Sequence, residues 1–221
     1  MLAACAAALW PAAAPASDLG ALRVETSPIA WRPSRALGTP AHGRLMDGVR
    51  LPARGQDYET WDFVLERRPN RGWRRWGTDT LIRVFLRVAR QYRAAHPGAP
   101  PLLAGDLSRP HGGHFGPEFG GVGHSSHQNG LDIDIYYPRR DGVLRAPTRV
   151  AQIDQPLAQD LVDRFVAAGA QLIFVGPHTG LHGPPRIVQP LYLHDNHMHV
   201  RIPNPLGDGT ATALDRSSKR R

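Results

Sequence analysis

One stretch limits the fold more than any other, residues 124–137, which read HSSHQNGLDIDIYY. Its second half alternates between apolar and acidic residues, which predicts a strand with Asp132 and Asp134 on one face and aliphatic side chains on the other. Two carboxylates side by side are costly to bury unless a cation or hydrogen-bond donors meet them. His124 and His127 precede the strand and supply imidazole nitrogens at its start.

A second stretch, residues 194–202 (HDNHMHVRI), has the same design. Its alternation predicts a strand, which we extend over residues 191–202, with His197, His199 and Arg201 on one face. Two strands that each bury an apolar face and present His or Asp on the other are what a zinc site on a sheet requires. The two stretches are therefore expected to pair.

The spacing supplies a set of three zinc ligands. His127 and Asp134 are separated by six residues, and His199 belongs to a His-x-His pair, so a fourth position stays open for water. Zinc would lower the pKa of that water and polarise a carbonyl group. A neighbouring imidazole could move the proton: His197, about 7 Å from His199 by strand geometry, or His194. Each motif alone is weak, and it is their combination on two alternating strands that predicts the metal site.

Other residues near these motifs receive supporting or neutral interpretations. Asp132 is interpreted as a group that orients His124 or His127 rather than as a ligand. The remaining loop histidines are expected to be solvated: His111, His114, His178 and His182. There is no Gly-x-Ser-x-Gly elbow and no His-Glu-x-x-His helix, which argues against serine hydrolase and helical zinc peptidase architectures.

The 221 residues suffice for one domain with a full core, and the formal net charge of +8 favours an anionic partner. No nucleic-acid-binding signature occurs, so nucleic acid is not the expected partner. Residues 1–16 are almost all Ala, Leu, Pro and Trp and are typical of a secretory leader, although its positive start is missing. The sequence Leu-Ala-Ala-Cys ending at Cys5 also fits a lipoprotein signal, in which Cys5 would carry a lipid anchor. No other run approaches the roughly 20 apolar residues of a membrane span.

The expected fold class is α+β, with a small antiparallel sheet that carries the zinc site and helices packed on its other face. Helices are predicted over residues 79–95, capped by Thr78 or Asp79, and over residues 155–170. Buried strands are predicted over residues 101–105 and 171–175. Four regions follow: the leader 1–16, an extended N-terminal arm 17–56, the domain 57–203 that carries the zinc site, and a disordered basic tail 204–221.

Three blocks together resemble the penicillin-insensitive murein endopeptidases, which belong to a wider group of zinc peptidases with lysostaphin-type enzymes, D-Ala-D-Ala metallopeptidases and the hedgehog fold. The blocks are residues 106–113 (DLSRPHGG), 123–134 (GHSSHQNGLDID) and 194–201 (HDNHMHVR). The likeness covers about residues 35–203. Known proteobacterial members carry several cysteines in disulfides, whereas this chain has Cys5 alone.

The resemblance implies residue roles and a substrate. Zinc would be bound by His127, Asp134 and His199. The further active-site histidines would be His124, His194 and His197, and the resemblance does not settle which one is the base. It implies hydrolysis of the D-alanyl–meso-diaminopimelyl amide in peptidoglycan crosslinks, in an exported protein of the periplasm or cell wall. Two rivals stay open: a zinc carboxypeptidase of the same fold that trims terminal D-Ala, and a non-catalytic wall-binding module with a structural metal.

Overall fold

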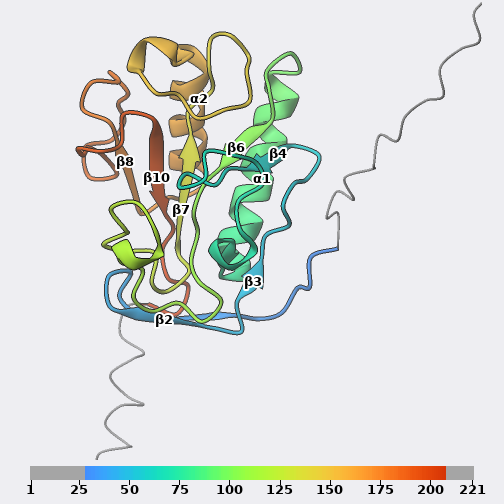
Figure 1. Cartoon of the computed structure of the whole chain (residues 1–221), viewed down its shortest axis with the longest axis vertical. Coiled ribbons are helices and arrows are strands. Elements are labelled where there is room, and N and C mark those ends of the chain that lie inside the picture. Colours follow the sequence, from blue (N-terminus) through green and yellow to red (C-terminus); the bar gives the residue numbers. More distant parts are fainter. Residues whose placement is uncertain (1–27, 208–221) are drawn as a thin grey trace, which may run out of the picture.

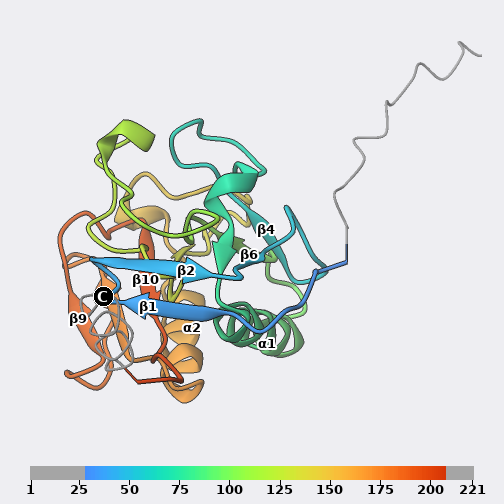
Figure 2. The same ribbon diagram turned by 90° about the horizontal axis from the view of Figure 1, so that it is seen from below.

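The computed structural model describes residues 28–207, which form one mixed sheet with two helices on one of its faces (Figures 1 and 2). The sheet has six strands in the order β4-β6-β7-β10-β8-β9. In chain order these are β4 Tyr58–Thr60, β6 Leu102–Ala104, β7 Asp132–Tyr136, β8 Leu172–Val175, β9 Val188–Pro190 and β10 His197–Arg201. The helices are α1 Asp79–Ala95 and α2 Gln155–Ala167. The predicted α+β class is confirmed.

The sheet is larger than expected, and only its centre is antiparallel. Strands β6, β7, β10 and β8 pair antiparallel, while β4 pairs with β6 and β9 pairs with β8 in parallel. Parallel neighbours need a long crossover connection. The chain between β4 and β6 contains α1, and residues 176–187 connect β8 to β9. These long connections are why the edges depart from the predicted antiparallel pattern.

The predicted helices form where the sequence signals placed them. The Thr78 hydroxyl accepts a hydrogen bond from the backbone N–H of Leu81 and caps α1, which ends at Ala95 as predicted. Helix α2 begins at Gln155 behind the capping Asp154 but ends at Ala167 rather than at residue 170. Gly169 has φ of 87°, a left-handed conformation that ends helices. The last three residues of the prediction therefore belong to the turn into β8.

The alternation of the two central strands is confirmed. Ile133 and Ile135 of β7 and Met198 and Val200 of β10 pack into the main core with the apolar sides of α1 and α2. The opposite face of the sheet carries the polar residues of both strands. In the antiparallel register Asp134 lies opposite His199, Asp132 opposite Arg201 and Tyr136 opposite His197. The register thus sets the acidic residues of one strand against basic residues of the other.

The second site strand is shorter than predicted, because β10 begins at His197 rather than at residue 191. Leu193 has φ of 69°, which breaks the extended conformation, and residues 191–196 form a loop. Residues 188–190, for which no strand was predicted, form the edge strand β9. His194 therefore reaches the site from a loop and not from a strand.

The region before residue 57 contributes short strands to the fold. A hairpin of β1 Arg35–Gly38 and β2 Gly43–Met46 lies across the lower end of the molecule in Figure 1. Strand β3, Val49–Arg50, pairs with β5, Trp76–Gly77. The core includes side chains from this region: Ala36, Val49 and Leu51.

The remaining elements are short 3-10 helices, η1 Gly72–Arg74, η2 Pro117–Phe119 and η3 Val150–Gln152. The predicted leader 1–16 lies outside the described residues, as do residues 17–27 and 208–221, so the division into four regions stays a prediction. Within residues 28–207, no helix is both long and apolar enough to cross a membrane.

Candidate active site

Three predicted residues meet where the loop before β7 faces β10. Nε2 of His127 lies 3.0 Å from Nδ1 of His199, and each of these atoms lies 3.2 Å from Oδ1 of Asp134. The side chains are almost fully buried, with 1% of His127, 4% of Asp134 and 4% of His199 exposed. We call this group the histidine–aspartate triangle. The register sets Asp134 opposite His199, and the loop before β7 brings His127 to them.

The hydrogen bonds around the triangle fix which nitrogen of each imidazole faces inward. Nδ1 of His127 lies 2.6 Å from the carbonyl oxygen of Leu107, which can only accept, so Nδ1 carries the proton and Nε2 presents a lone pair. His199 directs Nδ1 into the triangle, while its buried Nε2 lies 3.3 Å from Oδ1 of Asp132. A carboxylate behind the outer nitrogen of a histidine is the usual arrangement for a metal-binding imidazole.

The charges around the triangle attract a cation. Burial lowers the pKa of His199, but the negative charge of Asp132 and hydrogen bonds with Asp132 and Asp134 outweigh it and raise that pKa to about 9. For His127, burial is the largest effect, and its pKa is lowered despite the charge of Asp134. Two carboxylates therefore draw positive charge to His199, and the neutral His127 keeps its lone pair available.

Asp132 supports both histidines of the triangle. One of its oxygens accepts the backbone N–H of His127 at 2.8 Å, and the other accepts Nε of Arg201 at 2.6 Å. The support matters because His127 has φ of 64°, a left-handed conformation that is costly for a residue with a side chain. This contact matches the supporting role that the sequence suggested for Asp132.

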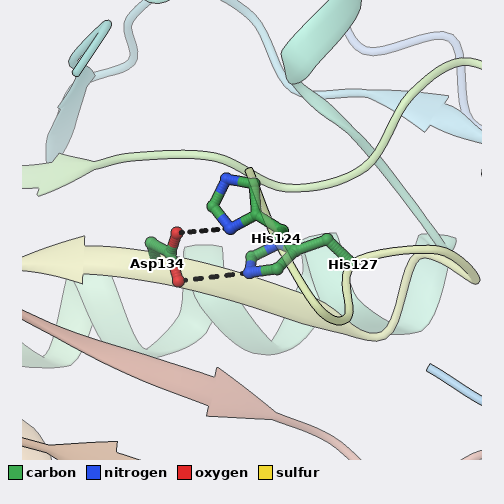
Figure 3. Close-up of side chains that lie close together, drawn as sticks. All are labelled: His124, His127 and Asp134. Atoms are coloured by element: carbon green, nitrogen blue, oxygen red, sulfur yellow. Dashed lines mark ion pairs between the residues drawn. The ribbon is translucent and has the colours of Figure 1, made fainter. Parts of the chain in front are cut away.

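His124 lies beside the triangle, and its ring and that of His127 both point to the carboxylate of Asp134 (Figure 3). One ligand atom from each of these three residues lies within 4.8 Å of the others, so they could also hold a metal ion. However, Nδ1 of His124 is 3.8 Å from the nearer oxygen of Asp134, longer than the 3.2 Å distance from His199. The triangle with His199 is the more compact of the two sets.

His124 is held by a buried ion pair that the sequence did not indicate. Its Nε2 lies 2.8 Å from Oδ2 of Asp106, and Asp106 accepts Nε of Arg74 at 2.7 Å and Nη2 at 2.5 Å. Asn70 donates to the same carboxylate at 2.9 Å. Burial raises the pKa of Asp106, but the hydrogen bonds from Arg74 and His124 outweigh it and keep that pKa well below its usual value. We call Arg74, Asp106 and His124 the arginine cluster.

His197 and His194 lie on the open side of the triangle. Nδ1 of His197 is 2.6 Å from Oδ1 of Asn196, which leaves Nε2 at 3.9 Å from Oδ1 of Asp134. Burial lowers the pKa of His197 to about 4, so its imidazole is neutral near pH 7. The backbone carbonyl of Tyr192 binds Nδ1 of His194 at 2.9 Å, and burial lowers the pKa of His194 as well. Each ring keeps an unprotonated Nε2 that could accept a proton.

The triangle opens into a cleft of about 980 Å³. All six predicted site residues line it, so the structure brings together His124, His127, Asp134, His194, His197 and His199. Its walls are the glycine-rich loop at residues 120–126 and the loop at residues 191–196. The other loop histidines are exposed, as expected: His111, His114, His178 and His182.

The family model and the curated proteins that match this chain carry the same name. Residues 36–172 match the family described as penicillin-insensitive murein endopeptidase; this range contains His124, His127 and Asp134 and ends before β10. Curated proteins with that name include one from Haemophilus influenzae, 26% identical over 89% of this chain and 81% of its own length. One from Salmonella heidelberg is 30% identical over 78% and 67%, and one from Yersinia enterocolitica is 28% identical over 81% and 70%.

Proposed function

The chain belongs to the penicillin-insensitive murein endopeptidase family, and we propose that it is a zinc-dependent endopeptidase of peptidoglycan crosslinks. The amide that it would hydrolyse joins D-alanine to meso-diaminopimelate. The observation that carries the proposal is the histidine–aspartate triangle, where two imidazole nitrogens and a carboxylate oxygen converge within 3.2 Å of one another. The names of the relatives support the substrate class.

The donor set of the triangle fits zinc. Zinc binds imidazole nitrogen and carboxylate oxygen at about 2.0–2.1 Å in a tetrahedron, which places neighbouring ligand atoms about 3.3 Å apart. The sides of the triangle, 3.0 to 3.2 Å, are close to that spacing. His127, Asp134 and His199 would hold the ion, and the cleft side would remain open to water and substrate. When bound, zinc would lower the pKa of a water molecule and polarise the amide carbonyl.

The surrounding residues would handle protons and orientation. Nε2 of His197 or of His194 would accept a proton from the attacking water and give it to the leaving amine, since both imidazoles are neutral near pH 7. Asp106 would fix the ring of His124 beside the reacting group. Asp132 would hold His127 and His199 in the orientation that the ion requires.

Such an activity requires export, and we propose that the protein acts in the periplasm or at the cell wall. The net charge of +8 suits an anionic polymer. The leader at residues 1–16 would direct export, and a lipid on Cys5 would add an anchor. Mass spectrometry of the mature protein from its native host tests both points through its N-terminal residue and mass.

The decisive experiment is digestion of purified crosslinked muropeptide dimers, followed by mass spectrometry. The expected products are monomers, formed by the wild type and not by His127→Ala, which should also lose zinc. His182→Ala removes an exposed histidine outside the cleft and should leave both properties unchanged. A chelator should stop cleavage by the wild type. Free D-alanine without monomers would identify a carboxypeptidase, and binding without products would identify a wall-binding module.

A further inference from the structure

Two arginines line the cleft, and they differ in their partners. Arg201 is paired with the buried carboxylate of Asp132, with Nε at 2.6 Å and Nη2 at 3.4 Å. Arg149 is exposed, and no carboxylate within residues 28–207 forms an ion pair with it. Arg149 therefore brings a positive charge to the cleft that the described part of the protein does not neutralise.

Hydrogen bonds to Gln152 hold the backbone of Arg149. The side-chain oxygen of Gln152 accepts the backbone N–H of Thr148 at 2.7 Å and that of Arg149 at 3.2 Å. It also accepts the Thr148 hydroxyl at 3.2 Å. Arg149 directly precedes η3 and lines the cleft there. Because the backbone is already hydrogen-bonded, binding a ligand there adds no cost of ordering this loop.

The acidic groups of the cleft are already engaged. Asp106 is paired with Arg74, Asp134 belongs to the triangle, and Asp195 is bonded to His178 at 2.7 Å. None of them lies within ion-pair distance of Arg149. The guanidinium offers five N–H donors in a planar fork that matches the two oxygens of a carboxylate. An anionic group on the ligand is the partner that this wall would select.

We propose that Arg149 binds the free carboxylate next to the reacting amide, on the diaminopimelyl side of the crosslink. This inference rests on the proposed function, because the crosslink supplies the carboxylate. The amide nitrogen is attached to a carbon that also bears a carboxylate, whereas the D-alanyl side presents a methyl group. Arg149 is a specificity residue in this arrangement, since it would select the leaving half of the substrate by charge.

The test compares two substrates with four proteins. The substrates are a crosslinked dimer with free diaminopimelyl carboxylates and the same dimer with the carboxylate next to the amide converted to a carboxamide. The proteins are the wild type, Arg149→Ala, Arg149→Lys and Arg145→Ala. Arg145 is a matched control, because it lies on the same connection, pairs with Glu66 at the surface and does not line the cleft. Its removal changes the net charge by the same amount.

The wild type and Arg145→Ala should prefer the free carboxylate by about tenfold in kcat/KM, mainly through KM. Arg149→Ala should treat the two substrates alike, and Arg149→Lys should recover part of the preference. An undiminished preference in Arg149→Ala would overturn the inference.

A binding measurement separates this inference from the proposed function. Calorimetry with the diaminopimelyl monomer and its carboxamide reports the same preference without hydrolysis. If neither the wild type nor any variant cleaves either dimer, the proposed endopeptidase activity is wrong. The calorimetric preference for the free carboxylate over the carboxamide still decides the role of Arg149. Loss of that preference in Arg149→Ala supports the inference, and its persistence contradicts it.

Discussion

Two buried polar clusters lie side by side on the open face of the sheet, and they balance charge in different ways. In the arginine cluster, Arg74 is a permanent cation that donates to both oxygens of Asp106, and His124 completes the set. In the histidine–aspartate triangle, the described ion-pair partners of Asp134 are all imidazoles, His127 and His199 at 3.2 Å and, farther away, His124 at 3.8 Å and His197 at 3.9 Å. An imidazole becomes cationic only when protonated, so the positive charge of the triangle must come from a proton or a metal ion.

This difference in charge balance gives the two neighbouring clusters separate roles. The charges of the arginine cluster balance one another, so the cluster should stabilise the fold whether or not zinc is present. In the proposed function the triangle binds zinc, so its stability and chemistry should follow the zinc concentration. Substitutions of Arg74 or Asp106 in the arginine cluster should therefore leave the response of the triangle to zinc intact.

The largest effect is expected for Asp134→Asn. The amide keeps the size of the carboxylate but removes its charge, so zinc affinity and crosslink cleavage should each fall by more than about a hundredfold. Zinc at 100 times its Kd should stabilise the wild type by about 2.7 kcal/mol in urea unfolding and should not stabilise this variant. Asp163→Asn, on the exposed side of α2, is the control. An unchanged zinc response in Asp134→Asn would refute the role given to Asp134.

Arg74→Met should have the largest effect on stability. It leaves the buried Asp106 carboxylate without its guanidinium partner, which should cost about 3–5 kcal/mol in the free energy of unfolding. The zinc-dependent increment should remain as large as in the wild type. Arg83→Met removes an exposed partner of Asp79 in α1 and should cost less than about 1 kcal/mol. If Arg74→Met abolished the zinc increment, the two clusters would not be independent.

His197→Gln should lower kcat by about a hundredfold while the zinc content stays at the wild-type level. The substitution removes the unprotonated nitrogen that would move the proton, but it leaves the three side chains of the triangle in place. His182→Gln, at an exposed histidine outside the cleft, serves as the comparison. Full activity in His197→Gln would transfer the proton-moving role to His194.

Thr78→Ala should have the smallest effect, a loss of about 1 kcal/mol in the free energy of unfolding. The hydroxyl caps α1 by accepting from the backbone N–H of Leu81, which belongs to neither cluster. Zinc affinity should not change. Thr80→Ala, inside the first turn of the same helix, tests whether the loss belongs to the cap and should not destabilise the protein.

The sequence predicted the elements that depend on local periodicity. Helix α1 and the central parts of β7 and β10 follow from repeated apolar spacing, and the alternation placed Asp134 and His199 on the polar face of the sheet. The strand predicted over residues 191–202 was too long, because Leu193 adopts a left-handed conformation that interrupts it. The apolar periodicity of the sequence gives no sign of this turn.

The contacts of the arginine cluster could not be predicted from local sequence patterns. Arg74 and Asp106 are 32 positions apart, and their pairing depends on how η1 packs against the end of β6. Arg74 belongs to a basic run in which no local pattern separates a buried arginine from the exposed ones. Nothing in the spacing of Asp106 indicates that it holds His124. Contacts of this kind become visible only when the whole fold is known.

We propose that His199, rather than His124, completes the zinc site with His127 and Asp134. Zinc titration of purified His199→Ala and His124→Ala tests it most directly, with zinc content measured in parallel. His199→Ala should lose affinity by more than about a hundredfold, while His124→Ala should stay within about tenfold of the wild type. Retention of zinc by His199→Ala together with its loss from His124→Ala would contradict this assignment of the third ligand.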